Sequence, residues 1–440
     1  MMKTITKISS LFPTGVLLTT FLLFFNVNVV HAQSDVVAEL TVNSGDLSFY
    51  NTPVIASLNG VHIKLHEGQL QLVEVTNGSE NYITSQLKQG NPDQLTWILE
   101  GETEPDTERN FELRVVDDAS GASSANNESV NVYDDGESLL VKIGEKNVLN
   151  YRYALKDVPD GVDELFKRGG YIHPIWSPGG KVLSRIQPPD HYHHYGIWNP
   201  WTRTEFEGRE VDFWNLGDGQ GTVQAKQVIE RNEGEVFGGF RALHNHVDFT
   251  GPTGEKVALN EQWEVNVWNV DPEKNVWLID FVSTLNPATD EPLTIKEYRY
   301  QGFSLRATET WNDNNTTLLT SEGYDKSNAN ATRARWIDVN GESDVEEGTS
   351  GILFMTNPSN FNYPEQLRIW PEGANQGVEN VYINFNPAQD RDWELKSGKT
   401  YALKYRMLVY DGEINENEAN RYWSDFANSP KIDVNPVSLD

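Results

Sequence analysis

The chain has 440 residues, with 35 lysine and arginine residues against 65 aspartate and glutamate residues, and no cysteine. Without cysteine, a disulfide scaffold, a zinc ribbon and a thiol nucleophile are excluded. The formal net charge of −30 argues against nucleic acid and anionic membrane surfaces as partners, because lysine and arginine must meet their phosphates. Hydrophobic residues make up 38% of the chain, which suits a packed core and excludes general disorder.

Residues 1–32 have the features of an export signal. Two lysines precede a largely apolar run over 16–30, and compact residues end the segment at Ala32. The run is short for a membrane span, and no later stretch approaches the roughly 18 apolar residues that a span requires. We therefore expect a signal peptide over 1–32, a secreted or periplasmic mature protein, and no membrane anchor.

The rest of the chain shows the alternation of β-strands. Over 257–268, one face of a strand would carry Val257, Leu259, Trp263, Val265 and Val267. The same alternation occurs over 401–410, and further candidate strands between turn-forming residues cover 276–285, 351–355 and 378–385. Many short strands of this kind predict an all-β fold made of antiparallel β-sandwich domains.

One helix and one domain boundary interrupt this pattern. Helical spacing predicts a short C-terminal helix over 413–427, with an apolar face made of Ala419, Tyr422, Trp423 and Phe426. Small polar residues over 119–127 indicate a linker or a long hairpin loop. We expect a small N-terminal β-domain over 33–135 and a large β-sandwich domain over 136–440.

Histidine, tyrosine and tryptophan gather in one part of the large domain. Six of the nine histidines lie between 173 and 246, and the densest part, 188–201, holds His191, Tyr192, His193, His194, Tyr195, Trp198 and Trp201. Imidazoles and phenols move protons, and aromatic rings stack on sugar faces. We therefore expect a carbohydrate site with Trp198, Trp201 and Trp214 as stacking or wall residues; the alternative is a tryptophan-rich core edge with surface histidines.

The histidine spacing also allows a metal site. If 190–196 is extended, His191 and His193 share one face. Such a pair can hold a divalent Zn, Cu or Mn ion with His173 as a third ligand, or with His244 or His246. A divalent metal ion is the only cofactor that the pattern suggests, and hydrogen-bonded or exposed imidazoles without metal are the alternative.

Cations near this cluster are informative because they are scarce. Arg203 follows the cluster, and Arg299 lies in a second basic segment over 296–306. An arginine fork can hold a carboxylate or sulfate in an acidic protein. The alternative is that these arginines form surface salt bridges with the abundant carboxylates.

Four segments together resemble the motif set of the PmoA-like domain family: 171–174, 188–196, 211–214 and 300–303. The resemblance covers roughly 140–425, and such proteins are typical of polysaccharide-degradation loci in Bacteroidota. The motifs are also similar to those of an oligosaccharide dehydratase of ulvan degradation. The resemblance implies loss of water from a terminal glucuronate, with the carried-over residues His173, His191, His193, His194 and Trp214.

These observations favour β-elimination at a uronic acid of an acidic oligosaccharide. Arg203 or Arg299 would neutralise the carboxylate, His194 would remove the C5 proton, and Tyr192 or Tyr195 would protonate the leaving oxygen. One alternative is a glycoside hydrolase using a carboxylate pair from the acids over 190–212. Another is a non-catalytic carbohydrate-binding protein.

Overall fold

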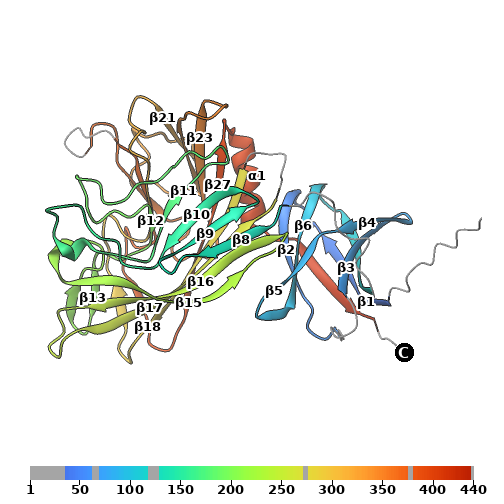
Figure 1. Cartoon of the computed structure of the whole chain (residues 1–440), viewed down its shortest axis with the longest axis horizontal. Helices are drawn as coiled ribbons and strands as arrows, with labels where there is room; N and C mark the ends of the chain where they lie inside the picture. The colour runs from blue at the N-terminus through green and yellow to red at the C-terminus, as the bar shows by residue number, and fades with distance from the viewer. Residues whose placement is uncertain (1–34, 62–68, 117–127, 271–275, 375–379, 438–440) are drawn as a thin grey trace, which may run out of the picture.

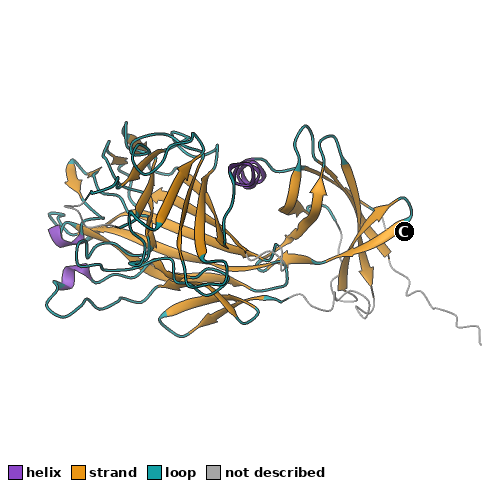
Figure 2. Cartoon of the chain, turned by 90° about the horizontal axis from the view of Figure 1, so that it is seen from above, coloured by secondary structure: helices purple, strands orange, loops and turns teal. Residues whose placement is uncertain are grey.

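The computed structural model describes residues 35–61, 69–116, 128–270, 276–374 and 380–437. The expected signal peptide over 1–32 and the stretch over 119–127 lie outside these residues. The described chain consists mainly of β-strands paired in antiparallel sheets (Figure 2). The expected all-β class, with antiparallel sandwich-like sheets and one short C-terminal helix, is confirmed.

Two sheets build the N-terminal part around their own hydrophobic core. One has the strand order β28 (Lys431–Pro436), β1 (Asp35–Asn43), β7 (Glu108–Val116), β3 (Gln69–Thr76) and β4 (Ser79–Ile83). The other has the order β2 (Phe49–Ser57), β6 (Asn91–Thr103) and β5 (Ser85–Lys88). Alternate residues of β1, such as Leu40 and Val42, are buried against Trp97 and Phe111 because neighbouring side chains on a strand point to opposite faces.

Two larger sheets share the main hydrophobic core (Figure 1). The first has the order β15 (Gly221–Asn232), β16 (Phe237–Asp248), β17 (Lys256–Trp268), β18 (Val276–Pro287), β27 (Tyr401–Asp411), β23 (Thr349–Thr356), β22 (Trp336–Glu342) and β21 (Thr316–Thr320). The second has the order β24 (Gln366–Ile369), β25 (Tyr382–Asn386), β20 (Phe303–Arg306), β12 (Ile197–Trp198), β11 (Tyr171–Ile175), β10 (Lys146–Arg152), β9 (Ser138–Ile143) and β8 (Val130–Asp134). A smaller sheet has the order β14 (Arg209–Val211), β13 (Thr204–Phe206), β19 (Leu293–Ile295) and β26 (Trp393–Leu395).

The C-terminal helix, α1 (Glu416–Ala427), lies within the expected 413–427. Its start is fixed by a capping box, in which Asn415 accepts from the helix backbone and the Glu418 side chain accepts from the Asn415 N–H. Its apolar face packs against Trp336 of β22 and Met355 of β23. Two 3-10 helices, η1 (Glu164–Phe166) and η2 (Leu216–Asp218), complete the helical elements of the described chain. Among the described residues, no helix has the length and apolarity needed to cross a membrane.

Strand pairing divides the chain differently from the expected ranges 33–135 and 136–440. β8 pairs with β9 and so belongs to the large sheets, although it precedes residue 136. β28 returns to the N-terminal part, where it pairs with β1 from Ala38 opposite Pro436 to Asn43 opposite Lys431. In Figure 1 this red strand lies among the blue ones. A composition shift can indicate a boundary, but it does not reveal pairing between the two ends of a chain.

Candidate functional site

The histidine-rich segment 188–194 forms two consecutive turns. The His191 N–H donates to the Pro188 carbonyl at 2.9 Å, and the His194 N–H donates to the His191 carbonyl at 3.0 Å. The segment 190–196 is therefore not extended, and the condition under which His191 and His193 would share one strand face is not met, because proline and aspartate at the start of the segment favour turns. Instead of sorting alternate imidazoles onto two faces, the turns bring His191, His193 and His194 together. One ring nitrogen of each lies within 4.8 Å of the others.

Gly196 ends this segment in a conformation that requires glycine. Its φ is +60°, and a Cβ atom there would lie 2.4 Å from the Ile172 carbonyl oxygen. The absence of a side chain lets the chain pass close to β11 and enter β12 directly after the turns. The histidine turns are thereby fixed to the middle of the second large sheet.

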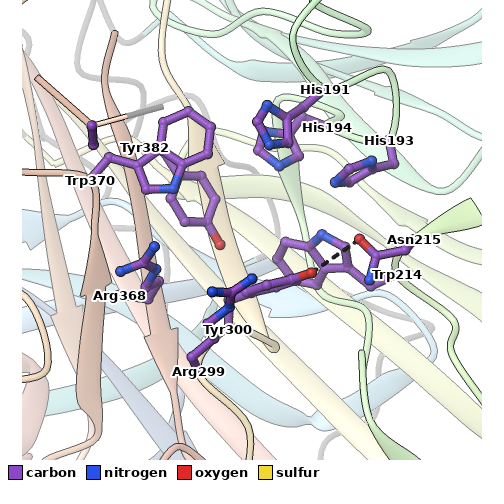
Figure 3. A pocket seen from close by; sticks show the side chains of 11 residues that line it. His191, His193, His194, Trp214, Asn215, Arg299, Tyr300, Arg368, Trp370 and Tyr382 are labelled. Carbon is purple, nitrogen blue, oxygen red and sulfur yellow. Dashed lines mark hydrogen bonds between the residues drawn. The ribbon is translucent and has the colours of Figure 1, made fainter. Parts of the chain in front are cut away.

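The three imidazoles form one side of a pocket of about 320 Å³ (Figure 3). The rest of its lining is aromatic or polar: Trp214, Asn215, Arg299, Tyr300, Arg368, Trp370, Ala374 and Tyr382. These residues are distant in sequence, but β24, β25, β20 and β12 are successive neighbours in one sheet. The strand order therefore brings the segments around 194, 300, 370 and 382 to one place.

A carboxylate orients His191 from behind. Asp190 Oδ2 lies 3.0 Å from His191 Nδ1, and Arg306 Nη2 donates to Asp190 Oδ1 at 3.0 Å and to Oδ2 at 2.7 Å. Burial alone would raise the pKa of Asp190, but the hydrogen bonds from His191 and Arg306 outweigh it and hold that pKa well below its usual range. An ionised carboxylate only accepts, so the His191 proton lies on Nδ1 and its Nε2 lone pair is free.

His194 has the opposite hydrogen-bonding arrangement. Its Nδ1 lies 3.5 Å from Nη1 of Arg306. A guanidinium only donates, so Nδ1 accepts and the neutral ring carries its proton on Nε2. Burial, followed by repulsion from His193 when that ring is protonated and from Arg306, holds the pKa of His194 well below its ordinary value. Burial and the neighbouring His191 also lower the pKa of His193 to about 3. His193 and His194 are therefore neutral at physiological pH.

Two arginines lie across the pocket from the imidazoles (Figure 3). The Arg299 guanidinium lies 5.5 Å from the centre of the Tyr300 ring, and Arg368 Nη1 donates to Asn330 Oδ1 at 3.0 Å. The Arg368 Nε is buried without a hydrogen-bond partner. Within the described chain neither guanidinium has a carboxylate at ion-pair distance, although carboxylates outnumber cations almost two to one. Two such cations in one pocket make a site for an anionic group.

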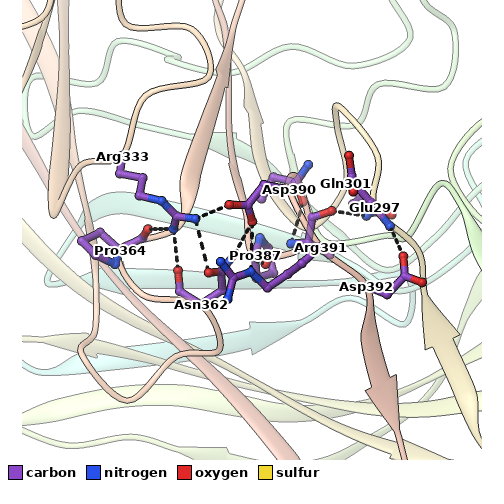
Figure 4. A network of polar contacts seen from close by, with 11 residues as sticks. Glu297, Gln301, Arg333, Asn362, Pro364, Pro387, Asp390, Arg391 and Asp392 are labelled. Atoms are coloured by element: carbon purple, nitrogen blue, oxygen red, sulfur yellow. Dashed lines mark hydrogen bonds and ion pairs between the residues drawn. The ribbon is translucent and has the colours of Figure 1, made fainter.

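The loop over 297–301, which carries two of the lining residues, is anchored by the polar network in Figure 4. The backbone N–H of Glu297 donates to Asp392 Oδ1 at 2.8 Å. Asp390, two residues before Asp392, accepts from Arg333 Nη2 at 2.6 Å. The network therefore holds the loop on the neighbouring chain segment rather than leaving it free at the surface.

Tyr300 is held in its neutral form. Its hydroxyl donates to Asn215 Oδ1 at 3.2 Å, and Asn215 Nδ2 donates to Asp212 Oδ2 at 2.7 Å. Burial raises the pKa of Tyr300 to about 12 and also raises that of Asp212. The hydroxyl is thus an oriented, protonated group at the pocket wall.

The structure brings five of the predicted site residues into the pocket: His191, His193, His194, Arg299 and Trp214. His173 is not among them, because its Nδ1 bonds the Ser184 hydroxyl at 2.9 Å and burial lowers its pKa to about 4. The third imidazole beside His191 and His193 is therefore His194, not His173.

The two tyrosines expected to act as acids lie outside the pocket lining. The Tyr192 ring packs 5.8 Å from the Phe166 ring, measured between centres. Tyr195 is fully buried, and its hydroxyl donates to the Phe166 carbonyl. In an extended strand these rings would share strand faces with the imidazoles. The turns instead direct them away from the pocket.

Two tryptophans and one arginine are also displaced from their expected places. Trp198 and Trp201 are fully buried, and Trp198 packs behind His194 with ring centres 5.0 Å apart. Arg203 lies near the surface, where its Nε donates to Glu210 at 2.5 Å. None of these three side chains lines the pocket.

The second histidine pair belongs to the core. His244 and His246 are fully buried; His244 Nε2 lies 2.7 Å from the Tyr151 hydroxyl, and His246 Nε2 lies 2.9 Å from Glu261 Oε2. Both imidazoles have partners inside the sheet and neither lines the pocket.

Several lining residues were not predicted: Asn215, Tyr300, Arg368, Trp370 and Tyr382. The roles of Asp190 and Arg306 were missed as well. The sequence feature that could have indicated part of this lining is Arg368, one of the few cations, two positions before Trp370. Nothing in the local sequence shows that β24 and β25 lie beside β20 and β12.

A family model described as a family of unknown function, DUF6807, matches residues 138–424. The chain belongs to the DUF6807 family. All residues lining the pocket fall within the matched range. No curated protein matches the sequence.

Among solved structures, an α-mannosidase from Enterococcus faecalis V583 aligns with a TM-score of 0.44 and 9% identity, over 91% of this chain. This chain spans 46% of the length of that enzyme. A galactose mutarotase related enzyme from Lactobacillus acidophilus aligns with a TM-score of 0.20 and 10% identity, over 65% of this chain and 100% of its own.

Proposed function

We propose that this DUF6807 protein is an exported carbohydrate-active enzyme that performs β-elimination at a uronic acid of an acidic oligosaccharide. The observation that carries the proposal is the placement of Arg299 and Arg368, which lack carboxylate partners among the described residues, across from three imidazoles. The resemblance to an oligosaccharide dehydratase favours water as the leaving group. Export still rests on the sequence of residues 1–32.

Arg299 and Arg368 supply the first requirement of the reaction. The C5 proton of a uronate is weakly acidic because the adjacent carboxylate is already negative. A guanidinium bound to that carboxylate stabilises the additional charge that develops when the proton leaves. The pocket is partly closed to water, so this interaction is stronger than it would be at an exposed surface.

The base is best supplied by His191. Asp190 holds its proton on Nδ1 and leaves the Nε2 lone pair to accept the C5 proton, and the carboxylate stabilises the imidazolium that forms. The sequence alone favoured His194 for this role. The contact between Arg306 and Nδ1 of His194 instead leaves that imidazole with a proton on the nitrogen it would need as a base.

The pocket walls suit a sugar. Trp370, which is 9% exposed, offers an aromatic surface against which the apolar face of a sugar ring can pack, whereas Trp214 lines the pocket but is fully buried. The volume of about 320 Å³ is at the small end of ligand sites, which favours a terminal sugar over the middle of a long chain.

The two alternatives receive less support. Among the described residues that line the pocket there is no aspartate or glutamate, and both Asp190 and Asp212 are engaged behind the wall. The pair of carboxylates that a glycoside hydrolase needs is therefore absent from the described lining of the pocket. A flat binding platform is not favoured either, because Trp198 and Trp201 are buried.

A divalent ion on the imidazoles is the second candidate, and it uses His191, His193 and His194. Nε2 of His194 binds a cation only if the ring proton moves to Nδ1, where Arg306 already donates. Elimination that depends on imidazoles alone is therefore our first proposal. Metal analysis of protein purified without chelator decides between the two: about one equivalent bound would favour the ion.

The test is incubation with a uronate-terminated oligosaccharide while following the ultraviolet absorbance of the C4=C5 double bond. Arg299→Gln should reduce turnover strongly, whereas Arg203→Gln, which removes an arginine outside the pocket, should leave it near the wild-type value. New reducing ends without the absorbance would show hydrolysis, and binding without either change would show a non-catalytic protein.

A further inference from the structure

His191 and His194 present complementary groups side by side. Their ring centres are 4.7 Å apart and the rings are inclined by only 24°. His191 offers a lone pair on Nε2, whereas His194 offers an N–H there. An acceptor and a donor thus lie on the same side of the pocket, a few ångströms from each other.

One buried side chain, Arg306, fixes the hydrogen bonding of both imidazoles. Arg306 is fully buried and extends from β20; it binds both Asp190 oxygens and donates to His194 Nδ1. Its guanidinium lies 4.8 Å from the centre of the Trp370 ring, which restrains it further. A lysine could not span these contacts, because an ammonium lacks the planar fork. Arg306 is therefore a positioning residue for both imidazoles.

We propose that the elimination runs on a single face of the sugar, with His191 and His194 as the catalytic residues and Arg306 setting their tautomers. The inference rests on the proposed elimination. His191 Nε2 takes the C5 proton, the C5–H electron pair forms the C4=C5 double bond, and the C4–O4 bond breaks. The departing oxygen accepts a hydrogen bond from His194 Nε2–H and then the proton from His191. Water leaves, and both imidazoles regain their starting protonation.

The side of the pocket formed by Arg299, Arg368 and Tyr300 offers no free acid among the described residues. Arg299 and Arg368 keep their protons, and the Tyr300 proton is directed at Asn215. The Tyr382 hydroxyl has no hydrogen-bond partner among the described residues, but the Tyr382 ring stacks on His194 with ring centres 5.2 Å apart and so belongs to the imidazole wall. An elimination across the ring would need a proton donor on the arginine side to meet O4. The geometry therefore favours removal of H5 and O4 from the same face.

This stereochemistry defines the substrate class. In glucuronate and mannuronate, H5 and O4 lie on one face of the ring. In the C5 epimers iduronate and guluronate, and in galacturonate, they lie on opposite faces. The first group fits a base and a donor on one wall, and the second does not.

The first test compares two disaccharides that share the same second sugar and end in glucuronate or in iduronate, each with a free C4 hydroxyl. Glucuronate should react at least about tenfold faster. Equal or faster reaction of iduronate would overturn the single-face route and leave the proposed elimination intact. If neither disaccharide reacts, both the proposed elimination and the single-face route are overturned.

The second test is independent of turnover. Nitrogen-15 shifts of the wild-type imidazoles should show His191 protonated on Nδ1 and His194 protonated on Nε2, with each signal assigned by its loss on substitution to asparagine. In Arg306→Lys the His194 pattern should change, whereas Arg203→Lys should leave it unchanged. A wild-type His194 protonated on Nδ1 would overturn the proposed role, whatever the fate of the variants.

Discussion

At the scale of single residues, the chemistry of the pocket depends on hydrogen bonds that its imidazoles make to side chains outside the lining. Asp190 and Arg306 lie outside the lining, yet they decide which nitrogen of His191 and His194 faces a ligand. The sequence predicted neighbouring imidazoles, and the structure brings His191, His193 and His194 together but not His173. The sequence could not assign their roles, because those depend on a partner more than 100 positions away.

His191→Asn should reduce kcat by about 10²–10⁴-fold, the range typical of a lost general base. The asparagine amide can still donate to Asp190, so the fold should persist. Steady-state kinetics on the uronate substrate measures the effect, with Tyr192→Phe as a control that removes a hydroxyl outside the pocket. Near-normal turnover by folded His191→Asn would remove His191 from the mechanism.

His193 should make the protein sensitive to acid. Its pKa of about 3 in the folded chain lies below the ordinary value near 6.5. Below about pH 6.5 the unfolded chain therefore binds a proton that the folded chain does not, and stability falls with pH until about pH 3. The free energy of unfolding of wild type, minus that of His193→Asn, should decrease over this range and stay constant above it. A flat difference in denaturant titrations would contradict the assigned burial effect.

At the scale of elements, periodicity succeeded where one side of an element faces the core. Alternation predicted β17 and β27 because their inward residues, such as Trp263 and Tyr405, are fully buried. Helical spacing predicted α1 for the same reason. Periodicity does not predict the turns over 188–196, because proline, aspartate and a left-handed glycine form them without any repeat of hydrophobic residues.

β28 offers a test of how the two ends of the chain depend on each other. Deleting 431–440 removes the partner of β1 and the apolar contacts of Ile432 and Val434 with the N-terminal core. Hydrogen exchange of β1 amides should then become faster, while turnover in the distant pocket stays close to normal. Deleting only 438–440 is the matched control, and unchanged β1 protection in the longer deletion would contradict the pairing.

At the scale of the whole molecule, the charge of the chain opposes the charge of its pocket. A net charge of −30 repels an acidic oligosaccharide at long range, whereas the pocket arginines attract it at contact. Salt near 0.15 M screens interactions beyond about 8 Å and weakens partly buried contacts less. KM for an acidic substrate should therefore fall as ionic strength rises from low values to this level. A steep rise in KM would show that long-range attraction dominates.

The product formed from a glucuronate-terminated oligosaccharide distinguishes elimination from hydrolysis. Proton NMR of the wild-type reaction should show a vinylic H4 signal, together with mass loss of one water and no shortening of the chain. The same oligosaccharide with its carboxylate reduced to an alcohol should not react, because Arg299 and Arg368 would have no anion to hold. Saturated products with new reducing ends would contradict elimination at the uronate.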